Sequence, residues 1–145
     1  MKKLFTCLVS FVIINITFSQ TGYYVSTTGD NGNSGAIDLP WETVQYGIDQ
    51  LSPGDVLNIM AGTYNEKIQF NNSGNSDNYL TLQNYNDDEV IIDGSGISDF
   101  EAIIEIYDQS YIVIEGLRIA NNEMSDAQGI LVENNCSNIM NRQRY

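Results

Sequence analysis

The stretches VIIDG (residues 90–94) and IVIEG (residues 112–116) are near-copies of one pattern, a run of β-branched residues that ends in a carboxylate and a glycine. Short apolar runs precede each copy, at residues 80–82 and 104–106, and a third set begins at residue 130. Strands that recur every twenty to thirty residues or so are typical of stacked repeats, in which no single repeat can bury its apolar face alone. The pattern therefore predicts a solenoid.

Further short strands of branched and aromatic residues fill most of the chain. We expect strands at residues 23–26, 56–60, 67–70, 80–83, 90–92, 103–106, 111–114, 117–120, 129–132 and 138–140. Asn-Gly hairpin turns are missing between them, so each strand is expected to pair in parallel with its counterpart one coil later. We predict an all-β parallel β-helix in which Ile92 and Ile114 both point inward.

One helical pattern begins at Pro40 and ends at the run Ser52–Gly54. Its apolar residues recur at intervals of three and four and form one stripe: Trp41, Val44, Ile48 and Leu51. A single short helix before a series of strands is expected to cover the exposed end of the stack, where unpaired backbone groups would invite aggregation.

Residues 1–19 have a basic start, an apolar stretch and small residues before a cleavage position, which is typical of a secretory signal peptide. A membrane anchor is the alternative. We expect residues 20–145 to form the N-terminal coils of one β-helix domain, secreted by a bacterium to the periplasm or the exterior and free of the membrane after cleavage. Cys136 would then be the only cysteine, so no disulfide framework is available.

Without Lys2 and Lys3, four basic residues face nineteen acidic ones, a formal charge of −15. Nucleic acid is excluded as a partner, because phosphate binding needs a basic stripe. The acidity fits a solvated surface or one that holds cations. The loop at residues 27–39 could bind a cation through Asp30, Asn31, Asn33 or Asp38, but its spacing departs from the calcium-loop pattern and favours a flexible turn.

Asp93 and Glu115 end the two near-copies. If the copies stack in register, neighbouring strands lie about 4.8 Å apart and the two carboxylates crowd each other. Two such charges need a cation, a raised pKa or side chains that splay into water. We therefore consider a calcium site at Asp93 and Glu115, with splaying as the alternative. The asparagines at the turns are expected to be structural: Asn84, Asn121, Asn122, Asn134 and Asn135.

Five stretches in a fixed order resemble the start of secreted right-handed parallel β-helix proteins of the pectate-lyase-like superfold. They are YYVS (23–26), PWETVQ (40–45), PGD (53–55), AGTY (61–64) and IIDG (91–94). The resemblance is closest to bacterial polysaccharide lyases that act on pectate, alginate or chondroitin. It implies a right-handed helix and an acidic polysaccharide as partner, while the same opening also occurs in hydrolases, epimerases and proteins without a known reaction.

Such lyases, as the resemblance implies, neutralise a uronate carboxylate with calcium or a cationic side chain, and remove the neighbouring carbon-bound proton with lysine or arginine. The mature chain offers Lys67, Arg118, Arg142 and Arg144. Arg118 alternates with Leu117 and Ile119, so we expect it to point outward and name it as a candidate for binding substrate. The alternative is a solvated arginine beside Glu115 or Asp126.

Two of these four basic residues fall in the last four positions, a change of composition that suggests a truncated or frame-shifted product; a genuine short protein is the alternative. Because the calcium ligands and the base of such lyases come from later coils, this chain by itself is expected to be inactive. A different function remains open, that of a non-catalytic extracellular module for carbohydrate binding or adhesion. The sequence determines neither the substrate nor the oligomeric state.

Overall fold

The computed structural model describes residues 20–96, 102–121 and 128–142. One helix and eleven strands are formed there: β1 Gly22–Val25, α1 Val44–Gln50, β2 Val56–Ile59, β3 Gly62–Tyr64, β4 Ile68–Phe70, β5 Leu80–Asn84, β6 Val90–Asp93, β7 Ala102–Tyr107, β8 Ser110–Glu115, β9 Leu117–Ala120, β10 Gln128–Glu133 and β11 Ser137–Arg142. The predicted strands are confirmed. Only β3 was not predicted as a strand, because it is three residues long and begins with glycine.

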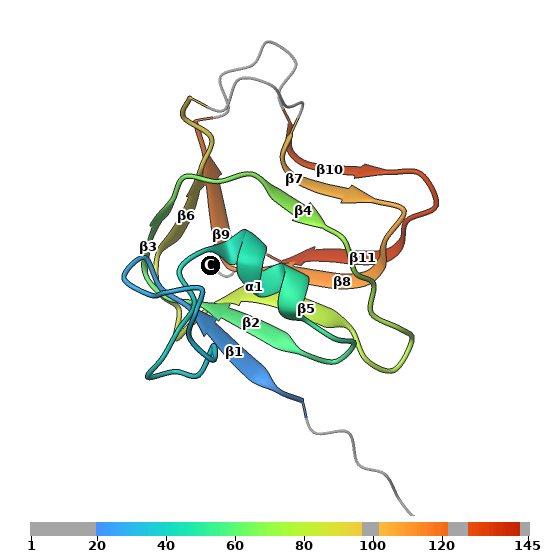
Figure 1. The fold of residues 1–145 in the computed structure, drawn as a ribbon. Helices are drawn as coiled ribbons and strands as arrows, with labels where there is room; N and C mark the ends of the chain where they lie inside the picture. Colours follow the sequence, from blue (N-terminus) through green and yellow to red (C-terminus); the bar gives the residue numbers. More distant parts are fainter. Residues whose placement is uncertain (1–19, 97–101, 122–127, 143–145) are drawn as a thin grey trace, which may run out of the picture.

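The strands form three parallel sheets that enclose one core (Figure 1). The first sheet has the order β1-β2-β5-β8-β11, the second β3-β6-β9 and the third β10-β7-β4. From β2 on, each turn of the chain adds one strand to each sheet in succession, and every ladder between named strands is parallel. The fold is a right-handed parallel β-helix, as the sequence predicted.

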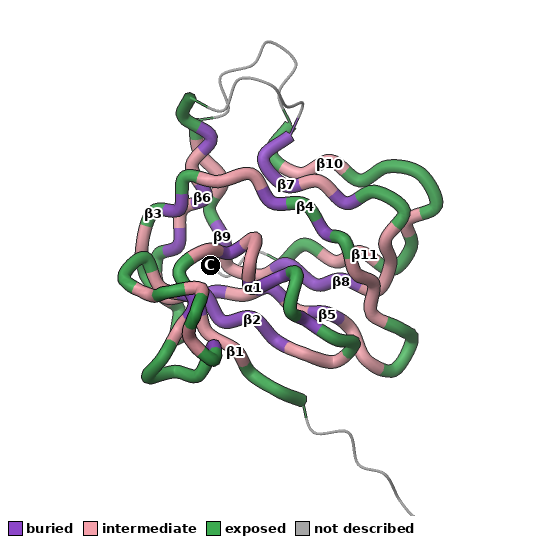
Figure 2. Tube along the Cα trace, viewed as in Figure 1, coloured by how far each residue is buried: buried purple, intermediate pink, exposed green. Residues whose placement is uncertain are grey.

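The core is a set of mostly branched side chains stacked one above another. Buried residues recur along the strands of all three sheets (Figure 2). In the first sheet Leu57 pairs with Leu82 and Leu82 with Ile114, all 2% exposed or less. Ile92 of the second sheet is fully buried. Ile92 and Ile114 thus both point inward, as predicted. Burying such a side chain contributes about 1.5–3 kcal/mol, so the stack is the main source of stability.

The register of the two near-copies differs from the prediction. Residues 90–93 pair with residues 117–120 in the second sheet, whereas residues 112–115 pair with residues 80–83 in the first. The copies therefore lie on different sides of the helix. The two near-copies are alike because both sides of the helix use the same local pattern, a strand of branched residues followed by a tight corner. Partners in the first sheet are 25, 32 and 27 residues apart (57 to 82, 82 to 114, 114 to 141).

Helix α1 lies across the opening at the β1 end of the stack and contacts β1, β2 and β4 (Figure 1). Its predicted apolar stripe is buried, with Val44 and Ile48 at 0% exposure. The helix is shorter than residues 41–51 because Thr43 is the N-cap and Trp41 forms a parallel bridge to Val25. The capping role predicted for this helix is confirmed.

The loop at residues 27–39 folds against the chain that leads into α1. The Asn31 side-chain oxygen accepts hydrogen bonds from the amides of Glu42 (2.9 Å) and Thr43 (3.1 Å), and the Trp41 indole N–H donates to the Asn33 carbonyl. The prediction of a flexible turn missed these contacts, which join residues about ten positions apart. Cation binding by this loop stays a prediction.

Gln45 pairs with the free edge of the third sheet. Its side-chain oxygen accepts from the Gln69 amide (2.6 Å) and its side-chain nitrogen donates to the Gln69 carbonyl (3.0 Å). The amide of one glutamine thus replaces the neighbouring strand that β4 lacks on this side. Unpaired edges are sites of aggregation, so this contact both stabilises and protects the sheet.

We expect Gln45→Ala to lower the free energy of unfolding by about 1–2 kcal/mol, because two hydrogen bonds are lost and the Gln69 backbone is left without partners. The Gln69 amide should also exchange faster with deuterium than in the wild type. Gln50→Ala is the matched control, since Gln50 is an exposed residue of the same helix and should cost at most about 0.5 kcal/mol. Equal effects of the two substitutions would contradict the edge-pairing role.

Candidate functional site

The structure separates the two acids that were expected to share calcium. Asp93 ends β6 in the second sheet and pairs with Ala120, whereas Glu115 ends β8 in the first sheet and pairs with Gln83 and Arg142. The prediction that they lie in register on neighbouring coils is wrong, because the near-copies occupy different sides of the helix. No group of three or more acidic, histidine or cysteine side chains in the described residues could hold a metal. Calcium binding stays a prediction.

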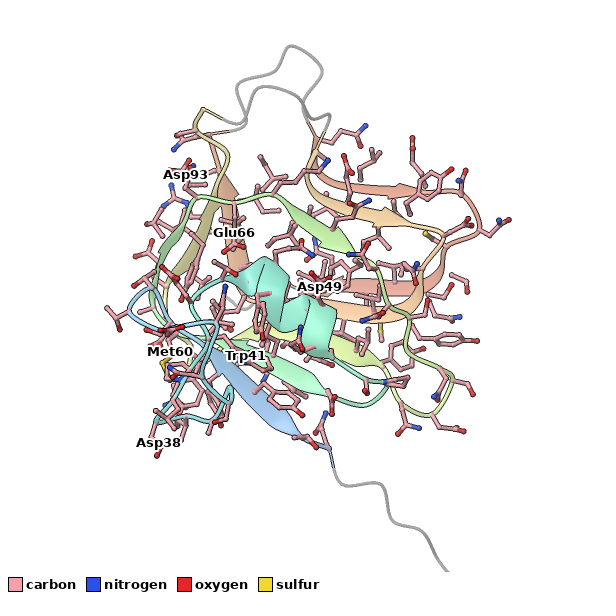
Figure 3. The ribbon with its side chains drawn as sticks, viewed as in Figure 1. Asp38, Trp41, Asp49, Met60, Glu66 and Asp93 are labelled. Atoms are coloured by element: carbon pink, nitrogen blue, oxygen red, sulfur yellow. The ribbon has the colours of Figure 1, made fainter. Side chains whose placement is uncertain are left out.

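Asp93 organises a corner of the helix (Figure 3). One carboxylate oxygen accepts hydrogen bonds from the Ser95 amide (2.9 Å), the Ser95 hydroxyl (2.7 Å) and the Asn121 side chain (3.1 Å). These donors, the Ser95 amide above all, hold the pKa of the carboxyl below its usual range. Asn65 in the preceding coil donates to the carbonyls of Asp93 and Ser95. The contacts join three successive coils, which is a structural role.

Glu115 belongs to a row of outward side chains that crosses the first sheet. The register aligns Tyr24, Asn58, Gln83, Glu115 and Arg142 on successive strands. Gln83 donates to the side-chain oxygen of Asn58 (2.9 Å), and Asn58 donates to the Tyr23 carbonyl. The row tightens the stack, since each amide links one coil to the next.

Arg118 points outward from the second sheet, as predicted. Its side chain is 65% exposed and lies 3.5 Å from Glu89, which is 74% exposed. The described partner is therefore Glu89; of the two partners named from the sequence, Glu115 lies in another sheet and Asp126 lies outside the described residues. Arg118 also lines a cavity of about 690 Å³ with Leu117, Ile119 and Ile130. A role in binding substrate stays a prediction.

The third sheet carries an ion pair that the sequence analysis did not find. The Lys67 ammonium lies 2.7 Å from a Glu105 carboxylate oxygen, and the two side chains are only 18% and 22% exposed. Glu105 stands in an outward row between Gln69 and Leu131. We name the outer face around Lys67, Gln69 and Glu105 the Lys67 face. It holds the best-enclosed cation of the described residues, so it is our candidate site for recognising an acidic group.

We expect Lys67→Met to lower the free energy of unfolding by about 1–3 kcal/mol, because it leaves the half-buried Glu105 carboxylate without its ammonium partner. Arg118→Met is the control and should cost less than about 0.5 kcal/mol, since its pair is long and largely exposed. Urea unfolding of both variants is the measurement. A cost for Arg118→Met equal to that for Lys67→Met would contradict the assignment of the Lys67 face.

Glu66 directly precedes Lys67 in the chain. Its side chain points away from Glu105, toward the start of α1 (Figure 3). Its two carboxylate oxygens accept from the amides of Val44 and Gln45, each at 2.9 Å. Burial raises the pKa of Glu66 above its usual 4.5, against the lowering effect of those two amides. Burial, with the charge of Glu66 nearby, also raises the pKa of Tyr64 to about 12. This carboxylate serves the helix rather than a ligand.

A comparison with known protein families gives a match over almost all of the β-helix. The Pel9A-like, right-handed β-helix region matches residues 23–144. The chain belongs to this Pel9A-like family. Pectate lyase PEL9 of Emericella nidulans is 36% identical over 73 residues, which are 49% of this chain and 18% of that enzyme. The uncharacterized protein YwoF of Bacillus subtilis is 31% identical over 71 residues, 49% of this chain and 15% of YwoF. The match thus spans less than a fifth of each relative.

Solved structures agree on the fold of this Pel9A-like chain. The lacto-N-biosidase of Eubacterium ramulus superposes with a TM-score of 0.65 at 19% identity, over 83% of this chain and 27% of that structure. Pectate lyase Pel9A superposes with a TM-score of 0.57 at 19% identity, over 69% of this chain and 28% of the lyase. A glycosidase and a lyase therefore share these coils, and the fold does not select between their reactions.

Proposed function

We propose that this chain forms the N-terminal coils of a secreted polysaccharide lyase-like protein that cleaves a uronate-containing polysaccharide by β-elimination. The match of the Pel9A-like family over residues 23–144 is the observation that supports it. The 36% identity to a pectate lyase points to an acidic polysaccharide. Secretion is supported by the signal-peptide pattern of residues 1–19, which lie outside the described residues. No helix in the described part of the chain is long and apolar enough to cross a membrane.

The reaction sets clear demands on the site. A base takes the proton on the carbon beside the uronate carboxylate, the electron pair forms a carbon–carbon double bond, and the glycosidic oxygen leaves with a proton. A cation must neutralise the carboxylate as charge develops, and it must be held close to the base. In the described residues Lys67 is bound to Glu105, and Arg118 lies beside Glu89 in a different sheet. These coils supply at most part of such a site.

The geometry supports the placement of the missing parts in later coils. Helix α1 covers the β1 end of the stack, whereas β9, β10 and β11 are the last strands of their sheets, so we propose that further coils add there. The identity to the pectate lyase covers 18% of that enzyme, so most of its length lies outside the match. Reading the DNA downstream of Tyr145 in all frames tests this placement. Further coils with lysine or arginine and clustered aspartates are expected, and their absence from every frame would contradict it.

We expect residues 20–145 alone to release no unsaturated product from pectate, alginate or chondroitin sulfate, with calcium or with EDTA. The physical reason is that the two best-placed cations lie on different sides of the helix, and each faces a carboxylate of the protein itself: Lys67 that of Glu105 and Arg118 that of Glu89. Ultraviolet absorbance of the unsaturated product is the measurement. Steady product formation that Arg118→Ala or Lys67→Ala abolishes would show that the site is already complete in these coils.

A second candidate function is a non-catalytic carbohydrate-binding or adhesion module. The hydrogen-bonded row Asn58–Gln83 and the corner at Asp93 favour it, because both features stabilise coils without serving a reaction. Downstream coils with monotonous Asn and Ser turns would support this module, whereas a cluster of acids beside a basic residue would support the lyase.

A further inference from the structure

A cavity of about 920 Å³ lies at the corner where the chain enters the first sheet, away from the Lys67 face of the third sheet. Three segments line it: Gln20 and Thr21 before β1, the turn at residues 52–55 before β2, and the turn at residues 75–78 before β5. Sites for small ligands have volumes of about 300–1,000 Å³. The cavity therefore has the size of a ligand site and spans the first three strands of the sheet.

The walls of this cavity, which we name the corner cavity, are held in place by the protein itself. Asp55 accepts from the Ser52 amide (2.8 Å) and its carbonyl accepts from the Thr81 amide (3.1 Å). The Asn75 side chain accepts from the amides of Asp77 (3.1 Å) and Asn78 (3.0 Å). Such turns need no ligand to set their shape, so binding would cost little ordering entropy.

One aromatic ring faces this polar lining. Tyr79 lines the corner cavity, and its ring is held edge-to-face by Tyr111 at 5.5 Å between centroids. A held ring offers a flat apolar surface and a phenolic hydroxyl at little entropic cost. A sugar matches both properties, since its ring presents C–H groups on one face and hydroxyls at its edge.

The charges of the lining select against anions. Asp55 and Asp77 are its charged residues, and no lysine, arginine or histidine is among the residues that line it. The Asp77 carboxylate has no hydrogen-bond partner in the described residues. The Ser52 amide donates to only one of the two Asp55 carboxylate oxygens, so the other can still accept. Carboxylates accept hydrogen bonds from hydroxyls and repel a uronate. We propose that the corner cavity binds a neutral sugar unit.

This proposal goes beyond the proposed lyase function and does not depend on it. The test uses residues 20–145 labelled with nitrogen-15, titrated with galactobiose, xylobiose, cellobiose and, as the anionic comparison, digalacturonate. At least one neutral disaccharide is expected to give saturable shifts of the amides of Ser52, Gly54 and Asp55 and of residues 75–81, whereas digalacturonate gives none there. The lyase assay has a separate readout, so failure of one proposal is distinguishable from failure of the other.

Two variants of cavity residues test the site, and each has a matched control outside the cavity. Tyr79→Ala and Asp77→Asn should each weaken the neutral disaccharide about tenfold, equivalent to about 1.4 kcal/mol. Tyr107→Ala and Asp38→Asn, which remove an exposed tyrosine and an exposed aspartate outside the cavity, should leave the affinity unchanged. Asp77 is exposed, so Asp77→Asn keeps the test valid if Tyr79→Ala fails to fold.

Several outcomes would overturn the proposal. They are the absence of saturable shifts at the corner with all three neutral disaccharides, shifts confined to other residues, and stronger binding of digalacturonate than of any neutral disaccharide. Equal loss of affinity in the cavity variants and in their controls would overturn it as well.

Discussion

Gly116→Ala is expected to lower the free energy of unfolding by about 3 kcal/mol or more. Gly116 has a φ of +70°, where an alanine costs about 1–2 kcal/mol. A methyl group there would also overlap the Asn84 side chain, because its carbon would collide with the Asn84 side-chain oxygen. Asn84 is only 7% exposed and donates to the Asp88 carbonyl, so it has no room to withdraw. Such overpacking adds about 1–3 kcal/mol.

Gly96→Ala separates these two contributions. Gly96 has a similar φ of +74°, and none of the described residues comes within 4 Å of the added methyl, so its substitution should cost only the backbone part, about 1–2 kcal/mol. In the double variant Asn84→Ala with Gly116→Ala, the collision is gone and the two costs should be less than additive. Urea unfolding of the wild type and of the Gly116→Ala, Gly96→Ala, Asn84→Ala and double variants is the measurement. Equal costs at Gly116 and Gly96 would show that the neighbouring coil yields to the methyl group.

Glu66→Ala is expected to lower the free energy of unfolding by about 2 kcal/mol at neutral pH. The carboxylate accepts from the Val44 and Gln45 amides, the first two of α1, and these donors would otherwise be half-buried without a partner. Loss of the helix end also disturbs the Gln45 contact with β4, because both depend on the position of α1.

The pH dependence of Glu66 follows from its raised pKa. The folded protein binds the proton more tightly than the unfolded chain does, so this contribution to stability is fully present below pH 4.5, the usual value, and is lost as the pH rises through the folded-state pKa. The difference in unfolding free energy between wild type and Glu66→Gln should therefore grow as the pH falls from neutral into that window. Gln50→Ala, which removes no titratable group from the same helix, should show no such growth. A difference that shrinks on acidification would contradict the raised pKa.

Much of the fold could be predicted from the sequence because its causes are local. Trp41, Val44, Ile48 and Leu51 form one stripe by their spacing alone, and they are buried at 5% exposure or less. Branched runs without hairpin turns indicated parallel coils. These patterns act within a few residues of one another, so a single sequence displays them.

The partners within the candidate site could not be predicted in the same way. Lys67 lies directly before β4 and Glu105 lies in β7, the next strand of the third sheet. Glu66 reaches back to amides 21 and 22 residues earlier. The loops between strands differ in length, so no fixed period connects such residues. The prediction that pairs Asp93 with Glu115 is wrong for this reason, because the likeness joins two different sides of the helix and is not the coil repeat.

The sequence by itself determined that this chain is a parallel β-helix closed at one end by an α-helix. The alternation of apolar residues in the strands and their spacing in the helix decide which side chains are buried. Only the tertiary structure decided which coil lies on which: the Lys67 face, the Asp93 corner, the contact of Asn84 with Gly116 and the corner cavity. Backbone pairing between coils is set by the sum of many loop lengths and side-chain fits, so its register appears only when all the coils are stacked together.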